Sequence, residues 1–113
     1  MAADALMWLV RDGKVLASIE VAESSRDRLR GLLGRDGVEG ALLLRPARSV
    51  HTLGMRFAID VAFLDPSLTV VRTVSMRPWR VGRPVFAAKS VLEAEAGSFA
   101  RWELKVGDVL ELR

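Results

Sequence analysis

The sequence contains no cysteine, no tyrosine and only one histidine. Without cysteine there is no disulfide framework, no thiolate nucleophile and no cysteine-based zinc site. A single histidine also excludes the histidine-rich zinc sites of hydrolases, and we expect neither a metal ion nor another cofactor. No apolar run approaches the ~18 residues that a membrane-spanning helix needs, so we expect no insertion into a membrane.

The composition is that of a folded chain, because half of the 113 residues are apolar and 27% are charged. This balance predicts one domain that covers residues 1–113. The N-terminal sequence MAADALMWLV has no basic residue, and its apolar run is short. A secretory signal needs a basic start, a longer apolar stretch and a cleavage site of small residues. We therefore expect a cytoplasmic protein.

Short apolar segments rich in β-branched residues recur along the chain and are separated by turn residues. Such spacing is typical of a small β-sandwich or barrel. Asp12-Gly13 predicts a hairpin between residues 5–10 and 15–21. The lack of alternating strands and helices argues against a parallel sheet. Further strands are predicted at residues 41–44, 49–53, 57–64, 68–76, 91–96 and 109–112, with a short helical turn over 97–103.

One helix is predicted over residues 24–34. Ser24 is a suitable N-cap, and Asp27 lies where its charge meets the positive end of the helix. Gly34 is a natural C-terminal stop. Gly31 inside the helix costs about 1 kcal/mol relative to alanine, which suggests the close approach of another backbone. We therefore expect a mainly β, jelly-roll-like sandwich or barrel with this one helix.

The net charge of +3 is unevenly distributed. Residues 41–92 carry eight basic and two acidic residues, and residues 72–89 carry no acidic residue. Arginine pairs well with phosphate or carboxylate, so Arg77, Arg80 and Arg83 are candidate anion-binding residues. The alternative is a solvated, proline-broken loop. We do not expect nucleic acid, because no recognised binding motif accompanies the charge, but this segment could dock a protein partner.

The most distinctive segment is RSVHTLGMRFAIDVAFLD, which runs from Arg48 to Asp65. It resembles the signature of the prokaryotic DUF192 family, a domain of unknown function. Other segments match the same family pattern in order, namely Arg30-Gly31-Leu32-Leu33, Ala41 to Leu44, Val91 to Glu93 with Gly97, and Val106-Gly107-Asp108.

The resemblance implies a small, mostly β domain with a jelly-roll-like or barrel-like topology, and it implies no established activity. Many family members carry Trp-Met-Lys-Asn-Thr where this chain has His51 to Met55. The position of His51 therefore suits a flat ring that stacks or packs better than an obligatory proton donor.

The candidate ligand-binding residues surround this segment: Arg48, His51, Thr52, Met55, Asp60 and Glu93. The leading hypothesis is a non-catalytic binding domain with a shallow pocket for a small polar ligand, either a carbohydrate or an anion. A second hypothesis is a small hydrolase or lyase that uses His51 with Asp60 or Glu93. A third is a protein or nucleic-acid interaction module built on residues 72–89.

Each candidate also has a structural interpretation. His51 could pack at a pocket rim, and Asp60 could form an ion pair or cap a turn, because a buried carboxylate needs a partner. Glu93 and Glu95 share one strand face, so they could simply be solvated. His51, Asp60 and Glu93 could hold a metal ion only if they converge.

Overall fold

The computed structural model describes residues 7–113 and contains seven strands and two short helices. The mainly β class predicted from the sequence is confirmed, and the 97–103 turn contains a second short helix. The elements in chain order are β1 (Met7–Arg11), β2 (Lys14–Ala22), α1 (Ser25–Arg30), β3 (Ala41–Leu44), β4 (Ile59–Leu64), β5 (Val70–Met76), β6 (Ser90–Glu95), α2 (Ser98–Trp102) and β7 (Glu111–Leu112).

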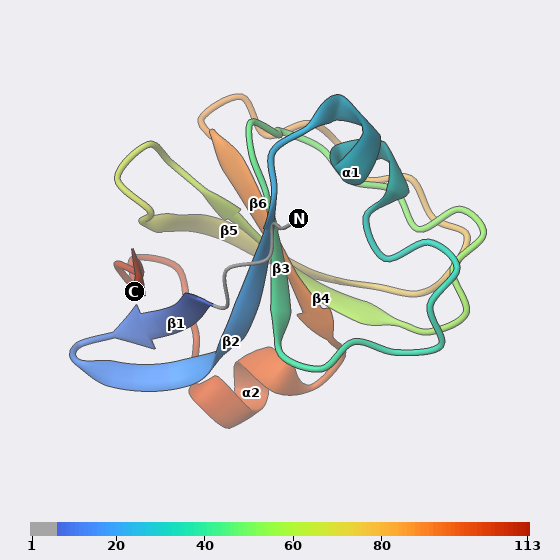
Figure 1. Ribbon diagram of the computed structural model, residues 1–113. Coiled ribbons are helices and arrows are strands. Elements are labelled where there is room, and N and C mark those ends of the chain that lie inside the picture. The colour runs from blue at the N-terminus through green and yellow to red at the C-terminus, as the bar shows by residue number, and fades with distance from the viewer. Residues whose placement is uncertain (1–6) are drawn as a thin grey trace.

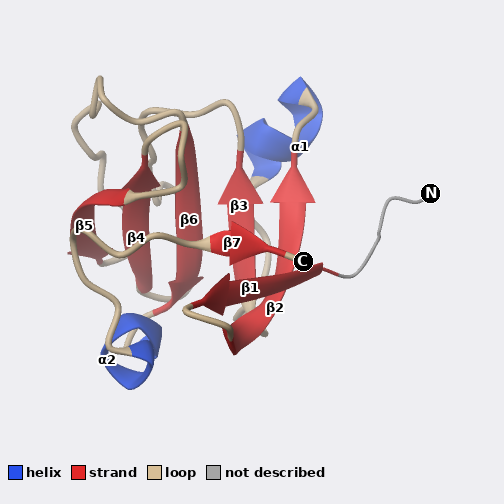
Figure 2. Ribbon diagram, turned by 90° about the vertical axis from the view of Figure 1, so that its left-hand side faces the viewer, coloured by secondary structure: helices blue, strands red, loops and turns tan. Residues whose placement is uncertain are grey.

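All seven strands belong to one curled sheet with the order β5-β4-β6-β3-β2-β1-β7. Figure 2 shows β4, β6, β3 and β2 side by side, with β1 and β7 crossing in front of them. The two ends of the sheet approach each other, because Thr69 bridges Val109 and the Leu110 amide donates to the Leu68 carbonyl at 2.9 Å. The single sheet matches the barrel alternative rather than a sandwich of two sheets.

Strand pairing is antiparallel except between β2 and β3, which run parallel. As expected, the sheet is not a parallel sheet, but it contains this one parallel pair, which was not predicted. A parallel pair needs a crossover connection, and residues 23–40, which include α1, provide it.

The β1–β2 hairpin forms where Asp12-Gly13 predicts it. Asp12 and Gly13 both have positive φ angles, 51° and 78°, as the two central residues of a type I′ turn require. The beginning of the predicted first arm, residues 5 and 6, lies outside the described residues.

The helix predicted over residues 24–34 is shorter than expected. Ser24 does cap it, since its side chain accepts a hydrogen bond from the Asp27 amide at 3.0 Å. The helix ends at Arg30 because Gly31 adopts φ 48° and ψ −126°, a conformation outside the helical range. In the part of the chain that the structure describes, no helix is long and apolar enough to cross a membrane.

The central strands β3, β4 and β6 are buried on both faces. One face packs into the core inside the curl, around Leu43, Leu64 and Leu92. The other packs against a second core, around Leu44, Phe63 and Val91, which includes Leu32 just after α1. Figure 1 shows α1 and the long connections gathered on one side of the sheet, and α2 at the opposite end from α1.

Two long connections, residues 45–58 and 77–89, are tied to each other. The Gly82 amide donates to the Val50 carbonyl, the Val85 amide to the Arg48 carbonyl, and the Trp79 amide to the Thr52 carbonyl. The strand predicted at residues 49–53 is absent, and only an isolated bridge at His51 remains. Residues 49–53 bond the 77–89 connection only at separate points, so no regular ladder of strand hydrogen bonds forms.

Candidate functional site

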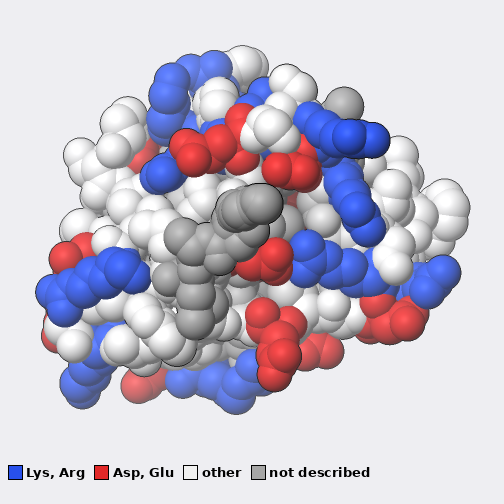
Figure 3. Space-filling model, in the orientation of Figure 1, with Lys and Arg blue, Asp and Glu red and all other residues white. Residues whose placement is uncertain are grey.

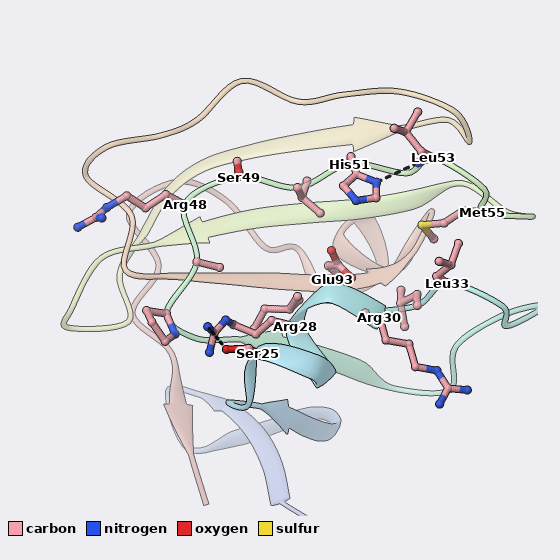
Figure 4. Close-up of a pocket in the computed structure, with 16 residues that line it drawn as sticks. Ser25, Arg28, Arg30, Leu33, Arg48, Ser49, His51, Leu53, Met55 and Glu93 are labelled. Carbon is pink, nitrogen blue, oxygen red and sulfur yellow. Dashed lines mark hydrogen bonds between the residues drawn. The ribbon is translucent and has the colours of Figure 1, made fainter.

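A cavity of about 440 Å³ lies between α1, the 45–58 connection and strand β6. Four of the six predicted ligand-binding residues line it: Arg48, His51, Met55 and Glu93. Thr52 and Asp60 do not. Figure 4 shows that β6 supplies Glu93, the 45–58 connection supplies His51 and Met55, and the α1 region closes the other side.

Glu93 is the buried polar group of this cavity, with 3% of its surface exposed. It lies on β6 between Leu42 of β3 and Val61 of β4, its two cross-strand neighbours. No other residue in the described range forms a hydrogen bond or ion pair with its carboxyl group. Loss of solvent raises the pKa of Glu93 to about 7, and the nearby charge of Arg35 opposes this increase.

His51 lies at the exposed side of the cavity, and its ring faces the space above Glu93 (Figure 4). Its Nδ1 atom accepts a hydrogen bond from the Leu53 amide at 3.2 Å. The neutral ring therefore carries its proton on Nε2, which leaves one N–H donor for a ligand.

The rest of the cavity is largely apolar near Glu93 and basic at its margin. Met55, only 6% exposed, and Leu33 lie on the same side of the cavity in Figure 4. The guanidinium groups of Arg30 and Arg48 point outward. Arg48 is also engaged elsewhere, because its Nε atom donates to the Ala88 carbonyl at 3.1 Å.

Thr52 is completely buried and joins the two long connections. Its hydroxyl donates to the Arg77 carbonyl at 2.6 Å and accepts from the Arg80 amide at 2.9 Å. With both capacities of the hydroxyl used, Thr52 positions the loop that follows β5 instead of facing the cavity.

Asp60 faces the opposite side of the sheet from Glu93. It pairs with Ala94, the next residue along β6, and successive residues of a strand alternate between faces. Its Oδ2 atom accepts hydrogen bonds from the Gly97 and Phe99 amides, both at 3.0 Å, at the beginning of α2. Asp60 therefore acts as a turn and helix cap in this structure.

The separation of Asp60 from Glu93 bears on the chemistry of the cavity. Asp60 cannot share a substrate with His51 across the sheet, so Glu93 is the carboxylate that is available to His51. Among residues 7–113, no group of three histidine, aspartate or glutamate side chains is placed to hold a metal ion.

The predicted anion-binding residues Arg77, Arg80 and Arg83 line a second cavity of about 440 Å³, next to β5. Arg72 of β5 lines it as well. The structure therefore brings these arginines together, but on a different cavity from that of Glu93.

The contribution of α1 to the first cavity was not predicted from the sequence. Arg28, Gly31 and Leu33 line it, and a Cβ atom on Gly31 would lie 3.8 Å from Oε1 of Glu93. The close approach of another backbone that Gly31 suggested is not found, because the Arg28 carbonyl and Glu93 would meet that Cβ only at ordinary contact distances. The positive φ of 48° at Gly31 accounts for the glycine instead.

Comparisons with known sequences agree with the resemblance of the central segment. The DUF192 family model, described as Uncharacterized ACR, matches residues 7–112. A UPF0127 protein of Pyrococcus furiosus is 43% identical over 111 residues, which is 93% of this chain and 96% of the relative. A UPF0127 protein of Pyrococcus abyssi is 33% identical over 98 residues, covering 82% of this chain and 84% of the relative.

Two solved structures share the fold. One is a protein of unknown function from Novosphingobium aromaticivorans, with a TM-score of 0.78, 20% identity, and coverage of 94% of this chain and 83% of that chain. The other is a candidate transcription regulator from Sinorhizobium meliloti, with a TM-score of 0.79, 19% identity, and coverage of 94% and 91%. At these identities the similarity establishes the fold alone.

Proposed function

Because the chain belongs to the uncharacterised DUF192 family, we propose its function from the cavity itself: it is a binding domain for a small polyhydroxylated molecule of the carbohydrate class. The observation that carries this proposal is the buried carboxyl group of Glu93, which faces the cavity without a partner among the described residues. Among the described residues, the fully enclosed side-chain polar atom without a partner is Oγ of Ser90, so the Glu93 oxygens stay accessible from the cavity, where a ligand hydroxyl would donate to them in place of water.

The donors and acceptors of the cavity suit a sugar ring. Glu93 accepts hydrogen bonds from ligand hydroxyl groups, and Nε2 of His51 donates one. The apolar C–H face of a sugar would pack on Met55 and Leu33. The volume of about 440 Å³ lies within the range of ordinary ligand sites.

An anion is a poorer occupant of this cavity than a carbohydrate. Above pH 7 the buried carboxyl group of Glu93 is mostly ionised, and it would repel an anion at close range. The arginines at the margin do not offset this repulsion. Arg30 and Arg48 point outward (Figure 4), and the guanidinium group of Arg28 donates to the Glu23 carbonyl and the Ser25 hydroxyl. The first cavity is thus assigned a neutral ligand.

The experiment is a thermal-shift screen of neutral mono- and disaccharides against the full chain, followed by calorimetry of any positive sugar. We expect at least one sugar to raise the melting temperature, and Glu93→Gln to weaken its binding by about tenfold or more. Glu95→Gln is the matched control, because Glu95 is exposed on the same strand and does not line this cavity. A panel that leaves the melting temperature unchanged would remove the basis of the proposal.

A second candidate function, acid–base catalysis as in a hydrolase or lyase, is favoured by one observation. The pKa of Glu93, raised to about 7, is that of an effective general acid or base, and His51 borders the same cavity. Incubation of a bound saccharide with the protein, followed by product analysis, separates the two functions. Turnover that is lost in both Glu93→Gln and His51→Gln would establish catalysis.

A further inference from the structure

The second cavity is built from the outer face of β5 and the loop that follows it. Arg72 comes from the strand, while Arg77, Arg80 and Arg83 come from the loop. Arg72 lies on the same sheet face as its cross-strand neighbour Phe63, which also lines the cavity. Four arginine residues from two elements therefore border one concavity.

These four arginines are not neutralised by the protein. All four are exposed, none of the residues that line the cavity is acidic, and none of the four forms an ion pair within residues 7–113. Elsewhere arginines do pair with carboxylates, as Arg35 does with Glu20, Arg45 with Glu23 and Arg56 with Asp36. Basic and acidic side chains are correspondingly interspersed over the face shown in Figure 3.

The loop that carries three of these arginines is held in place by hydrogen bonds from the 45–58 connection. The Thr52 hydroxyl bonds the backbone at Arg77 and Arg80, and the Gly82 amide donates to the Val50 carbonyl at 3.0 Å. Arg80 is further oriented, because its Nη1 atom donates to the Pro78 carbonyl at 3.3 Å. A site whose backbone is already ordered loses less conformational entropy when a ligand binds.

We propose that this second cavity binds a diphosphate group. Guanidinium groups pair with phosphate oxygens through two parallel hydrogen bonds, and several unpaired guanidinium groups match the charge and the many acceptors of a diphosphate better than those of a single carboxylate. The repulsion among four like charges around one cavity also decreases when the anion enters. The second cavity shares no lining residue with the first, so this proposal does not depend on the proposed function.

The experiment is calorimetric titration of the full chain with inorganic pyrophosphate at constant ionic strength. We expect saturable binding, and we expect it to weaken when the titration is repeated at higher salt. In Arg80→Gln the affinity for pyrophosphate should decrease by about tenfold or more, which is about 1.4 kcal/mol of binding free energy. Arg26→Gln is the matched control. Arg26 is exposed on α1 and lines neither cavity, and its substitution removes the same charge. It should bind within about twofold of the unmodified chain.

Three results would overturn the proposal. One is the absence of saturable binding at millimolar pyrophosphate. Another is equal weakening in Arg80→Gln and Arg26→Gln, which would indicate attraction by net charge alone. The third is binding of a single-stranded oligonucleotide that pyrophosphate does not displace. Sugar binding measured in Arg80→Gln keeps this test separate from that of the first cavity, because that binding should be unchanged.

Discussion

Replacement of Glu93 by glutamine should change the pH dependence of stability in a defined direction. The carboxyl group is buried on β6 between Leu42 and Val61, and its pKa is raised from 4.5 to about 7. Glutamine has nearly the same shape and no ionisable proton, so the substitution removes the titration while retaining the packing.

Whether stability increases or decreases with pH depends on which state, folded or unfolded, holds the proton of Glu93. Between about pH 4.5 and pH 7 the unfolded chain has released the proton of Glu93 while the folded chain keeps it, so the free energy of unfolding decreases as the pH rises. This contribution is fully present below the unfolded pKa and is lost as the pH passes through the folded pKa. At 1.36 kcal/mol for each pKa unit, the loss amounts to about 3 kcal/mol.

The assay is urea unfolding at about pH 4.5 and about pH 8, followed by the fluorescence of the three tryptophans. Between the lower and the higher pH, the free energy of unfolding of Glu93→Gln should increase by about 3 kcal/mol relative to that of the unmodified chain. This corresponds to a relative shift in the urea midpoint of roughly 1–3 M. Glu95→Gln, on the exposed end of the same strand, should show no such gain. A difference between Glu93→Gln and the unmodified chain that is the same at both pH values would refute the assignment of a desolvated carboxyl group.

Three further substitutions test the structural roles of neighbouring residues by chemical unfolding. Thr52→Val should cost about 1–3 kcal/mol, because a carbonyl and an amide lose their hydroxyl partner; Thr52→Ser should retain most of the stability, and equal losses would contradict this role. Asp60→Ala should cost about 1–3 kcal/mol through the loss of two amide hydrogen bonds at α2, and a change below about 0.5 kcal/mol would count against the cap. Gly31→Ala should cost more than about 1 kcal/mol, since φ is 48° there while the added Cβ meets only ordinary contacts. An unchanged unfolding midpoint for Gly31→Ala would show that the backbone relaxes without strain.

Features that depend on a few neighbouring residues could be predicted from the sequence. The Asp12-Gly13 hairpin forms because these residue types tolerate the two positive φ angles of a type I′ turn. The cap at Ser24 forms because its hydroxyl reaches the Asp27 amide three residues ahead. The end of α1 could not be placed in the same way, because Gly31 and Gly34 are both suitable stops, and only the structure shows that Gly31 is the one that leaves the helical conformation.

In the candidate site, too, some features could be predicted from the sequence and others could not. Glu93 stands out in the sequence as a carboxylate inside an apolar strand, His51 as the single histidine of the most distinctive segment, and both border the first cavity. Asp60 has the same sequence signature as Glu93 and lies on the opposite face, where it caps α2. No local pattern distinguishes the two carboxylates, because their roles depend on which strands flank them and which segment covers each face.

The sequence by itself determined the mainly β class, the hairpin, the cap of α1 and the uneven distribution of charge, since these depend on backbone preferences over a few residues and on composition. Tertiary structure alone decided the partner of each polar group. Sheet curvature and strand register bring Glu93 beneath His51 and leave it without a hydrogen bond from residues 7–113, and they separate it from Asp60. They also place Arg72 beside the loop arginines. The physical reason is that hydrogen bonding and solvent exclusion act between atoms close in space, whatever their separation along the chain.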